Sequence, residues 1–391
     1  MNIKTSDRAG RYIRQLQGDL TYSAFVPRAL PPDPPLSVGM ELVNLVADAS
    51  LALGNLDGAA ITLPNPDLFV AMYVRKEAVV SSQIEGTQAS LSELLEFEAR
   101  VSPSGRLGDV GEVVNYVKAM NHGLQRVETL PVSLRLLREV HAILLEGTRG
   151  SERAPGEFRR TQNWVGAAGS TLKEAMYVPP PPSEVVRCLG ELETFIHTQT
   201  NLHPLIKCGL IHSQFETIHP FLDGNGRLGR LLVTFLLCQA KVLRRPLLYV
   251  SAFFKRHQSE YYLHLQRVRD EGDWEGWLRF FLGGVRTVAQ EATQNVRTIL
   301  KMETEHRNLL VSAGPRSTNP QALLGLLFQR PYLSIGQVQD ALGISFGTAR
   351  SLVQFLEEHL LLREVTGKRR DRLFCYQPYL DILRRDIEAT L

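Results

Sequence analysis

The segment that most constrains this chain is HPFLDGNGRLGR, at residues 219–230, which places polar and flexible residues between two apolar stretches. Apolar residues recur at helical spacing over 202–219, and residues 228–242 are apolar almost all round, as in a central helix. A Gly-Asn-Gly corner between two helices is usually only a tight turn. A turn alone does not account for His219, Asp223 and two arginines at the same corner. The pattern predicts a functional loop in a helical core.

Two familiar loop motifs share part of this pattern. Gly224, Gly226 and Gly229 fit the dinucleotide-binding GxGxxG, but a helix precedes them instead of a strand, and the acidic residue expected about 20 positions later is absent. A calcium-binding EF-hand loop starting at Asp223 would require a glutamate at its twelfth position, where Thr234 stands. Both interpretations are rejected.

A zinc site is a third alternative. His212, Glu216 and His219 are spaced i, i+4, i+7, so one helical face would gather three metal ligands. The simpler interpretation is that His212 and Glu216 pack or form hydrogen bonds beside the corner. A metallohydrolase therefore stays open as a minority hypothesis.

The loop chemistry favours a polyphosphate. Gly224–Gly226 opens a helix, where unpaired backbone N–H groups and the helix dipole attract anions. Arg227 and Arg230 add two guanidinium groups, and Asp223 offers a hard oxygen that suits Mg²⁺. A neutral imidazole at His219 would accept a proton from an attacking hydroxyl. A nucleoside triphosphate, a metal and a base without a protein nucleophile indicate transfer from a nucleotide to a hydroxyl.

HPFLDGNGRLGR fills every position of HxFx[D/E]GN[G/K]RxxR, and the chain therefore resembles the Fic family from residue 20 to residue 290. The resemblance implies a helical Fic fold and AMPylation, the transfer of AMP from ATP to a Ser, Thr or Tyr hydroxyl of a protein, including the enzyme itself. It implies His219 as general base and Asp223 as Mg²⁺ ligand. The nucleotide-binding positions that it implies are Gly224, Asn225, Gly226, Arg227, Leu228, Gly229 and Arg230. Among these, Arg227 would bind the β/γ end and Arg230 the γ-phosphate.

Other segments also match the family. Glycines, β-formers and a four-proline stop over 161–182 predict a short hairpin, which the resemblance makes the flap that pairs with the target by strand addition. Phe221 and the GEFR stretch at 156–159 are interpreted as structural. Tyr261 and Tyr262 lie in an EYY stretch where similar members contact the adenine side, and Tyr262 is our candidate. A core role for at least one of the two tyrosines stays open.

A second motif lies upstream, in SSQIEG at residues 81–86. Ser81, Glu85 and Gly86 match the family's inhibitory pattern [S/T]xxxE[G/N]. The resemblance implies that the Glu85 carboxylate pairs with Arg230 and takes the place of the γ-phosphate. The sequence therefore predicts a self-inhibited enzyme.

Local patterns predict further elements along the first hundred residues. The proline-rich segment 20–38 is expected to be an extended arm. Residues 65–86 are expected to form a helix capped by Asn65 and ending at Gly86. Ser90 with Glu93 resembles a capping box that opens another helix, and 101–109 is expected to be a loop.

The fold class is predicted to be mainly α, in four parts. Residues 1–109 are the N-terminal arm and a helical region with the inhibitory motif, and 110–290 are the catalytic core. Residues 291–320 are a helical linker, and 321–391 form a winged helix-turn-helix, because helix, tight turn, helix and two strands follow in that order.

The bulk properties exclude few functions. A net charge of +3 does not indicate a nucleic-acid partner, and no run reaches the roughly 18 apolar residues of a membrane span. Four cysteines stand far apart, which favours a reduced, cytoplasmic setting. Residues 330–391 hold nine Lys/Arg and eight Asp/Glu, so DNA binding and a protein-interaction or dimerisation role both stay open. The basic cluster that would contact DNA phosphates consists of Arg363, Lys368, Arg369, Arg370 and Arg372.

Alternatives to AMPylation also stay open. The same site would suit another nucleotide donor, or a de-AMPylase in which Glu85 positions water. A different class is a nucleotide-sensing DNA-binding regulator, although His219 argues against it because binding alone needs no base. A homodimer is a further open possibility, and the target protein is not identified by the sequence.

Overall fold

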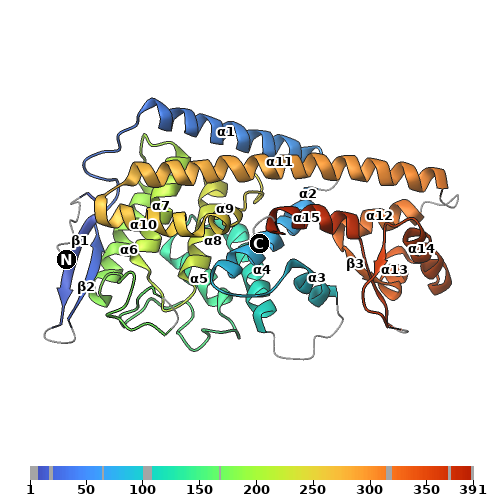
Figure 1. Ribbon diagram of the computed structural model, residues 1–391, viewed down its shortest axis with the longest axis horizontal. Coiled ribbons are helices and arrows are strands. Elements are labelled where there is room, and N and C mark those ends of the chain that lie inside the picture. Colours follow the sequence, from blue (N-terminus) through green and yellow to red (C-terminus); the bar gives the residue numbers. More distant parts are fainter. Residues whose placement is uncertain are drawn as a thin grey trace.

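The computed structural model describes residues 8–16, 21–63, 66–99, 108–166, 169–313, 319–368 and 371–388. These residues form a mainly helical protein with short antiparallel strands at its two ends (Figure 1), which confirms the predicted fold class.

Helix α8 (Asn225–Gln239) lies at the centre of the molecule. Four helices pack against it: α2 (Pro66–Ile84), α4 (Gly108–Val127), α5 (Leu134–Leu144) and α7 (Pro204–Ile218). Nearly every α8 residue up to Leu237 is buried, as the apolar sequence predicts. Within the described part of the chain, no helix is long and apolar enough to cross a membrane.

Further helices enclose this centre. Helix α6 (Pro182–His197) packs against α7, and α9 (Ser251–Arg256) packs against α2. Helix α10 (Gln258–Glu271) precedes the long α11 (Trp274–Ala313), and α1 (Met40–Ile61) lies alongside α11 across the molecule (Figure 1). Residues 291–313 of the predicted helical linker are helical, and they continue α11 from the predicted core without a break at residue 290.

The N-terminal segment differs from the predicted arm. Strands β1 (Gly10–Gln15) and β2 (Tyr22–Pro27) pair antiparallel, with Gly10 opposite Pro27 and Gln15 opposite Tyr22. The arm is extended as predicted, but it belongs to a hairpin whose first strand carries no clear alternation in sequence. The Phe25 N–H also donates to the Val178 carbonyl at 2.9 Å, so this hairpin braces the end of the segment predicted as the flap.

Helix α2 ends two residues before the predicted Gly86, which has a φ of +93° in the turn that follows. The predicted cap Asn65 lies outside the described residues. Ser90 and Glu93 form the predicted capping box, since the Ser90 N–H donates to the Glu93 carboxylate at 2.7 Å and the Glu93 N–H donates to Ser90 Oγ at 3.2 Å. Helix α3 (Leu91–Ala99) starts there. Of the predicted loop 101–109, residues 108 and 109 already belong to α4.

In the C-terminal module, helix, turn, helix and two strands follow one another in the predicted order. Helices α12 (Asn319–Gln329), α13 (Ile335–Leu342) and α14 (Phe346–Glu358) combine with strands β3 (Tyr332–Ser334), β4 (Arg363–Glu364) and β5 (Leu373–Cys375), and α15 (Gln377–Glu388) follows. The sheet is antiparallel in the order β3-β5-β4. Helix α12 packs against α2, and β3 packs against α3, so the module rests on the two helices that flank residues 85–90.

Candidate active site

The twelve-residue motif forms the turn between α7 and α8. His219 ends α7 with φ +48° and ψ +60°, a left-handed conformation that is uncommon outside glycine. Gly224 precedes α8 with φ +75°, which favours glycine there. Phe221 is fully buried and stacks on His141 with ring centroids 3.8 Å apart, which confirms it as the structural anchor of the loop.

His219 is half-buried, and its backbone is fixed from behind. Arg159 Nε donates to the His219 carbonyl at 2.9 Å, so the GEFR arginine is structural as predicted. Burial lowers the pKa of His219 to about 4, and the positive charge of Arg159 adds to this effect. The imidazole is therefore neutral near pH 7, the form in which it accepts a proton.

The first turn of α8 forms an anion cradle that holds a protein carboxylate. Gly224 makes no side-chain cap hydrogen bond, so the first N–H groups of the helix remain for another partner. A Cβ atom added at Gly226 would lie only 2.1 Å from Glu85 Oε1, so the carboxylate rests directly on that glycine. The Glu85 carboxylate thus occupies the place where the sequence predicts a phosphate.

Arg230 is held by residues of the SSQIEG segment, residues 81–86. Its Nη2 donates to Glu85 Oε1 at 2.6 Å and to the Ser81 carbonyl at 2.9 Å, while Nε donates to Ser81 Oγ at 2.8 Å. The Arg230 side chain is 1% exposed and that of Glu85 is 32% exposed. Burial opposes ionisation of Glu85, but the charge of Arg230 and its hydrogen bond outweigh burial and lower the Glu85 pKa. Both groups are therefore charged, and they neutralise each other.

Asp223 sits at the mouth of the cradle. Asp223 Oδ1 accepts the Gly224 N–H at 2.6 Å and lies 3.5 Å from Arg227 Nη2, and the Asp223 side chain is 29% exposed. A carboxylate with one oxygen fixed and part of its surface open fits a ligand of Mg²⁺ beside phosphates.

Three of the predicted nucleotide-binding residues make contacts that hold the loop and its helix in place. The Asn225 side chain accepts from the Phe221 N–H and donates to the Phe221 carbonyl, so it closes the loop. Leu228 is fully buried, and its N–H already bonds to the Gly224 carbonyl. Gly229 allows α7 to approach, because an added Cβ would lie 2.2 Å from Glu216 Oε1.

The two tyrosines separate clearly. Tyr261 is 1% exposed, and its hydroxyl bonds His212 Nε2 at 2.9 Å, so it belongs to the core. Tyr262 is 39% exposed, and its pKa is raised by burial and by the nearby Glu85 charge.

The proposed zinc ligand His212 has both ring nitrogens engaged, because Nδ1 bonds the Gly229 carbonyl and Nε2 bonds the Tyr261 hydroxyl. A zinc-ligand role is therefore excluded for His212 in this arrangement.

The predicted hairpin at 161–182 is looser than expected. Its two arms meet in one antiparallel bridge between Val165 and Tyr177, with N–H···O distances of 2.9 and 3.1 Å. Residues 167–168 lie outside the described part. Within the described residues, this segment contributes no continuous strand.

Comparison with known families agrees with this geometry. The model described as Fic/DOC family N-terminal matches residues 43–125, and the model described as Fic/DOC family matches residues 131–237, which include the motif and α8. The chain belongs to the Fic/DOC family.

Named Fic relatives match only part of their own length. The protein adenylyltransferase Fic of Drosophila grimshawi is 30% identical over 202 residues, which are 50% of this chain and 38% of that protein. The protein of the same name from Drosophila melanogaster is 28% identical over 246 residues, 62% of this chain and 45% of that protein. The chain therefore spans less than half the length of either relative.

Two solved structures share the Fic fold. A Fic family protein from Desulfovibrio desulfuricans G20 superposes with a TM-score of 0.57 at 24% identity, covering 88% of this chain and 97% of that one. A Fic domain containing signaling protein from Bacteroides thetaiotaomicron VPI-5482 gives a TM-score of 0.50 at 17% identity, covering 66% and 97%. At these identities the likeness supports the fold alone.

Some residues of this Fic site were not foreseen from the sequence. His141 on α5 bonds the Asp223 carbonyl through Nε2 at 2.9 Å and accepts the Gly156 N–H through Nδ1 at 2.8 Å, which fixes the loop. Burial lowers the pKa of His141 to about 4. Glu112 on α4 bonds Arg227 Nη1 at 3.1 Å. Their sequence contexts are ordinary helices, so only the fold reveals them.

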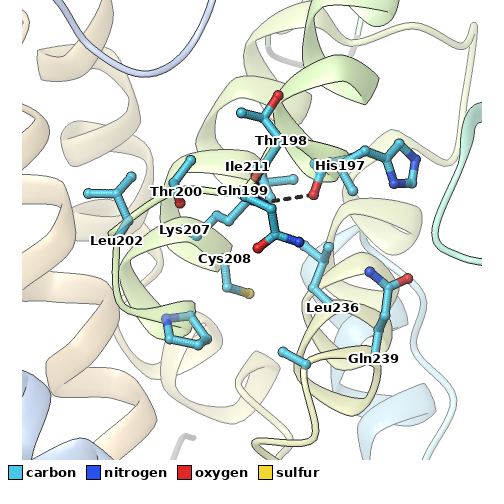
Figure 2. A pocket seen from close by; sticks show the side chains of 13 residues that line it. His197, Thr198, Gln199, Thr200, Leu202, Lys207, Cys208, Ile211, Leu236 and Gln239 are labelled. Carbon is cyan, nitrogen blue, oxygen red and sulfur yellow. Dashed lines mark hydrogen bonds between the residues drawn. The ribbon is translucent and has the colours of Figure 1, made fainter.

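A separate cavity of about 390 Å³ lies where α7 begins and α8 ends, away from the turn that joins the two helices. Figure 2 shows its lining from the end of α6, the start of α7 and the end of α8, including His197, Lys207 and Gln239. The motif joins the opposite ends of α7 and α8, so this cavity is not part of the Fic site. Lys207 donates to the Ile196 and Thr198 carbonyls, which explains its place there.

Proposed function

We propose that this protein is a self-inhibited protein adenylyltransferase, which transfers AMP from ATP to a Ser, Thr or Tyr hydroxyl of a protein. The observation that carries the proposal is the anion cradle at Gly226, in which a carboxylate of the same chain pairs with Arg230. A carboxylate in the position of a terminal phosphate would block nucleotide binding. Such a block is useful only if the unblocked site acts on a nucleotide.

The proposed step uses residues of the motif in distinct roles. The target hydroxyl oxygen attacks the α-phosphorus of ATP. The bond from the α-phosphorus to the oxygen that bridges it to the β-phosphorus breaks, and pyrophosphate leaves. Neutral His219 takes the hydroxyl proton. The α8 N–H groups, Arg227 and Arg230 hold the phosphates in line for the attack. Asp223 would hold Mg²⁺, which would supply positive charge to neutralise the phosphates and to help pyrophosphate leave.

The inhibition follows from shared use of one arginine. Arg230 cannot give the same Nη2 donor to Glu85 and to a γ-phosphate, so a triphosphate binds productively only after Glu85 leaves. The target would align its strand along the 161–182 segment, with Tyr262 beside the nucleotide. The four free cysteines fit a reducing, cytoplasmic setting, which is part of the proposal.

The experiment is intact-mass analysis of purified Glu85→Gly after incubation with ATP and Mg²⁺, alone and with lysate proteins. We expect adenylate adducts, and their loss in Glu85→Gly/His219→Ala with ATP affinity retained. Phosphate adducts would instead indicate a kinase. Loss of ATP binding in the His219→Ala variant would make His219 a structural residue.

A further inference from the structure

The second arginine of the motif is also held by a buried carboxylate. Arg227 is 1% exposed, and its Nη1 donates to Glu112 Oε2 at 3.1 Å, where the Glu112 side chain is 3% exposed. Glu112 comes from α4, outside the motif and 115 residues away in sequence. A buried carboxylate keeps its charge only where donors surround it.

Three donors surround Glu112. Besides Arg227, Thr87 Oγ1 donates to the same Oε2 atom at 3.0 Å, and Arg149 Nε lies 3.3 Å from Oε1. The backbone N–H of the next residue, Gln88, donates to Asp109 Oδ2 at 2.7 Å, one turn earlier on α4. The first turns of α4 therefore bind the chain that leaves the inhibitory helix.

Arg227 retains donors for a ligand. Its Nη2 lies 3.5 Å from Asp223 Oδ1, a distance that gives only a weak contact. Its Nε is buried and has no hydrogen-bond partner among the described residues. Leaving a buried donor unpaired costs free energy, and a phosphate oxygen in the neighbouring cradle would satisfy it.

We propose that Glu112 is a positioning residue for nucleotide binding, which fixes the Arg227 guanidinium beside the α8 cradle so that it meets the β-phosphate. Thr87, two residues after Glu85, completes the setting of that carboxylate. This inference rests on the proposed function, since it takes the cradle to be the phosphate site.

Glu112 differs in kind from Glu85. Glu85 is one-third exposed and its removal frees Arg230, whereas Glu112 is buried among three donors and stays in place when a nucleotide enters. Its loss therefore weakens binding, while the loss of Glu85 strengthens it. Because AMP has no β-phosphate, the effect is specific to nucleotides that have one.

The test measures ADP and AMP affinities by calorimetry with Mg²⁺, in the Glu85→Gly protein with and without Glu112→Gln. We expect about tenfold weaker ADP binding from Glu112→Gln, equivalent to one lost hydrogen bond between charged groups, and AMP binding within about twofold. Glu139→Gln, which removes the charge that Glu139 of α5 pairs with Arg126 of α4, is the control and should change neither affinity.

Equal losses for ADP and AMP, or no loss for either, would overturn the proposal. If Glu112→Gln does not fold, Thr87→Val decides, with an expected fall of about threefold in the ratio of ADP to AMP affinity; an unchanged ratio overturns the proposal. If Glu85→Gly itself binds neither nucleotide, the proposed function falls as well. If it binds both and Glu112→Gln alters neither, only this inference falls.

Discussion

Replacing Glu85 by glycine should activate the protein without disordering the arginine that it releases. Arg230 makes three hydrogen bonds to Ser81 and Glu85, and only the one with Glu85 is ionic. The two bonds to Ser81 remain in Glu85→Gly, so the guanidinium keeps its orientation. The substitution therefore removes the competing charge and leaves the phosphate site assembled.

The expected gain in rate is set by the strength of the ion pair between Glu85 and Arg230. A hydrogen bond between charged groups contributes about 1.5–3 kcal/mol, and the lower part of that range applies because Glu85 is 32% exposed. About 1.5–2 kcal/mol is equivalent to a 10- to 30-fold higher fraction of protein with Arg230 free, since about 1.4 kcal/mol is tenfold. The rate at subsaturating ATP should rise by the same factor.

The assay is the initial rate of pyrophosphate release at matched ATP and Mg²⁺ for wild type, Glu85→Gly and Glu85→Gln. The glutamine variant keeps the shape of the side chain and removes its charge, so it should recover most of the gain. A Glu85→Gly rate within about threefold of wild type would refute the ion-pair reasoning. An inactive Glu85→Gln beside an active Glu85→Gly would mean that the side chain blocks the site by its bulk.

Three further outcomes are expected. In the Glu85→Gly background, Ser81→Ala should raise the KM for ATP about three- to tenfold, because Arg230 Nε loses its partner at 2.8 Å; an unchanged KM would contradict this role. As the pH is lowered, protonation of His219 should reduce the kcat/KM of Glu85→Gly only near the His219 pKa of about 4. A loss of activity centred near pH 6.5 would instead show an ordinary, solvated imidazole. Burial raises the pKa of Glu77 from 4.5 to about 7, so the folded state binds this proton more tightly and loses stability as the pH rises from 4.5 towards and past 7. In urea unfolding, the free energy of unfolding of Glu77→Gln should therefore rise relative to that of wild type by up to about 3 kcal/mol between pH 5 and 8. Parallel pH profiles of unfolding free energy for the two proteins would rule this out.

The local arrangement of the candidate site follows from the sequence. His219, Asp223 and Gly226 are close in sequence, and helix-end chemistry alone brings their groups together. The pairing of Glu85 with Arg230 joins residues that are 145 positions apart, and it was predicted only because two family patterns name both of them.

Long-range packing explains what the sequence did not reveal. Glu112 and His141 sit on ordinary amphipathic helices, and their partners are chosen by how α4 and α5 pack against α8. Asn225 resembles a phosphate ligand in sequence, but its amide matches the Phe221 backbone at both ends. The first strand of the N-terminal hairpin was missed because its pairing partner, rather than its own pattern, makes it a strand.

The most direct test of the central claim uses Glu85→Gly with ATP labelled at either the α- or the γ-phosphate, and wild type as the reference. We expect α-label on protein hydroxyls, much less of it with wild type, and no protein-bound γ-label. Protein-bound γ-label, or α-label that does not depend on Glu85, would contradict a nucleotidyl transferase restrained at Arg230.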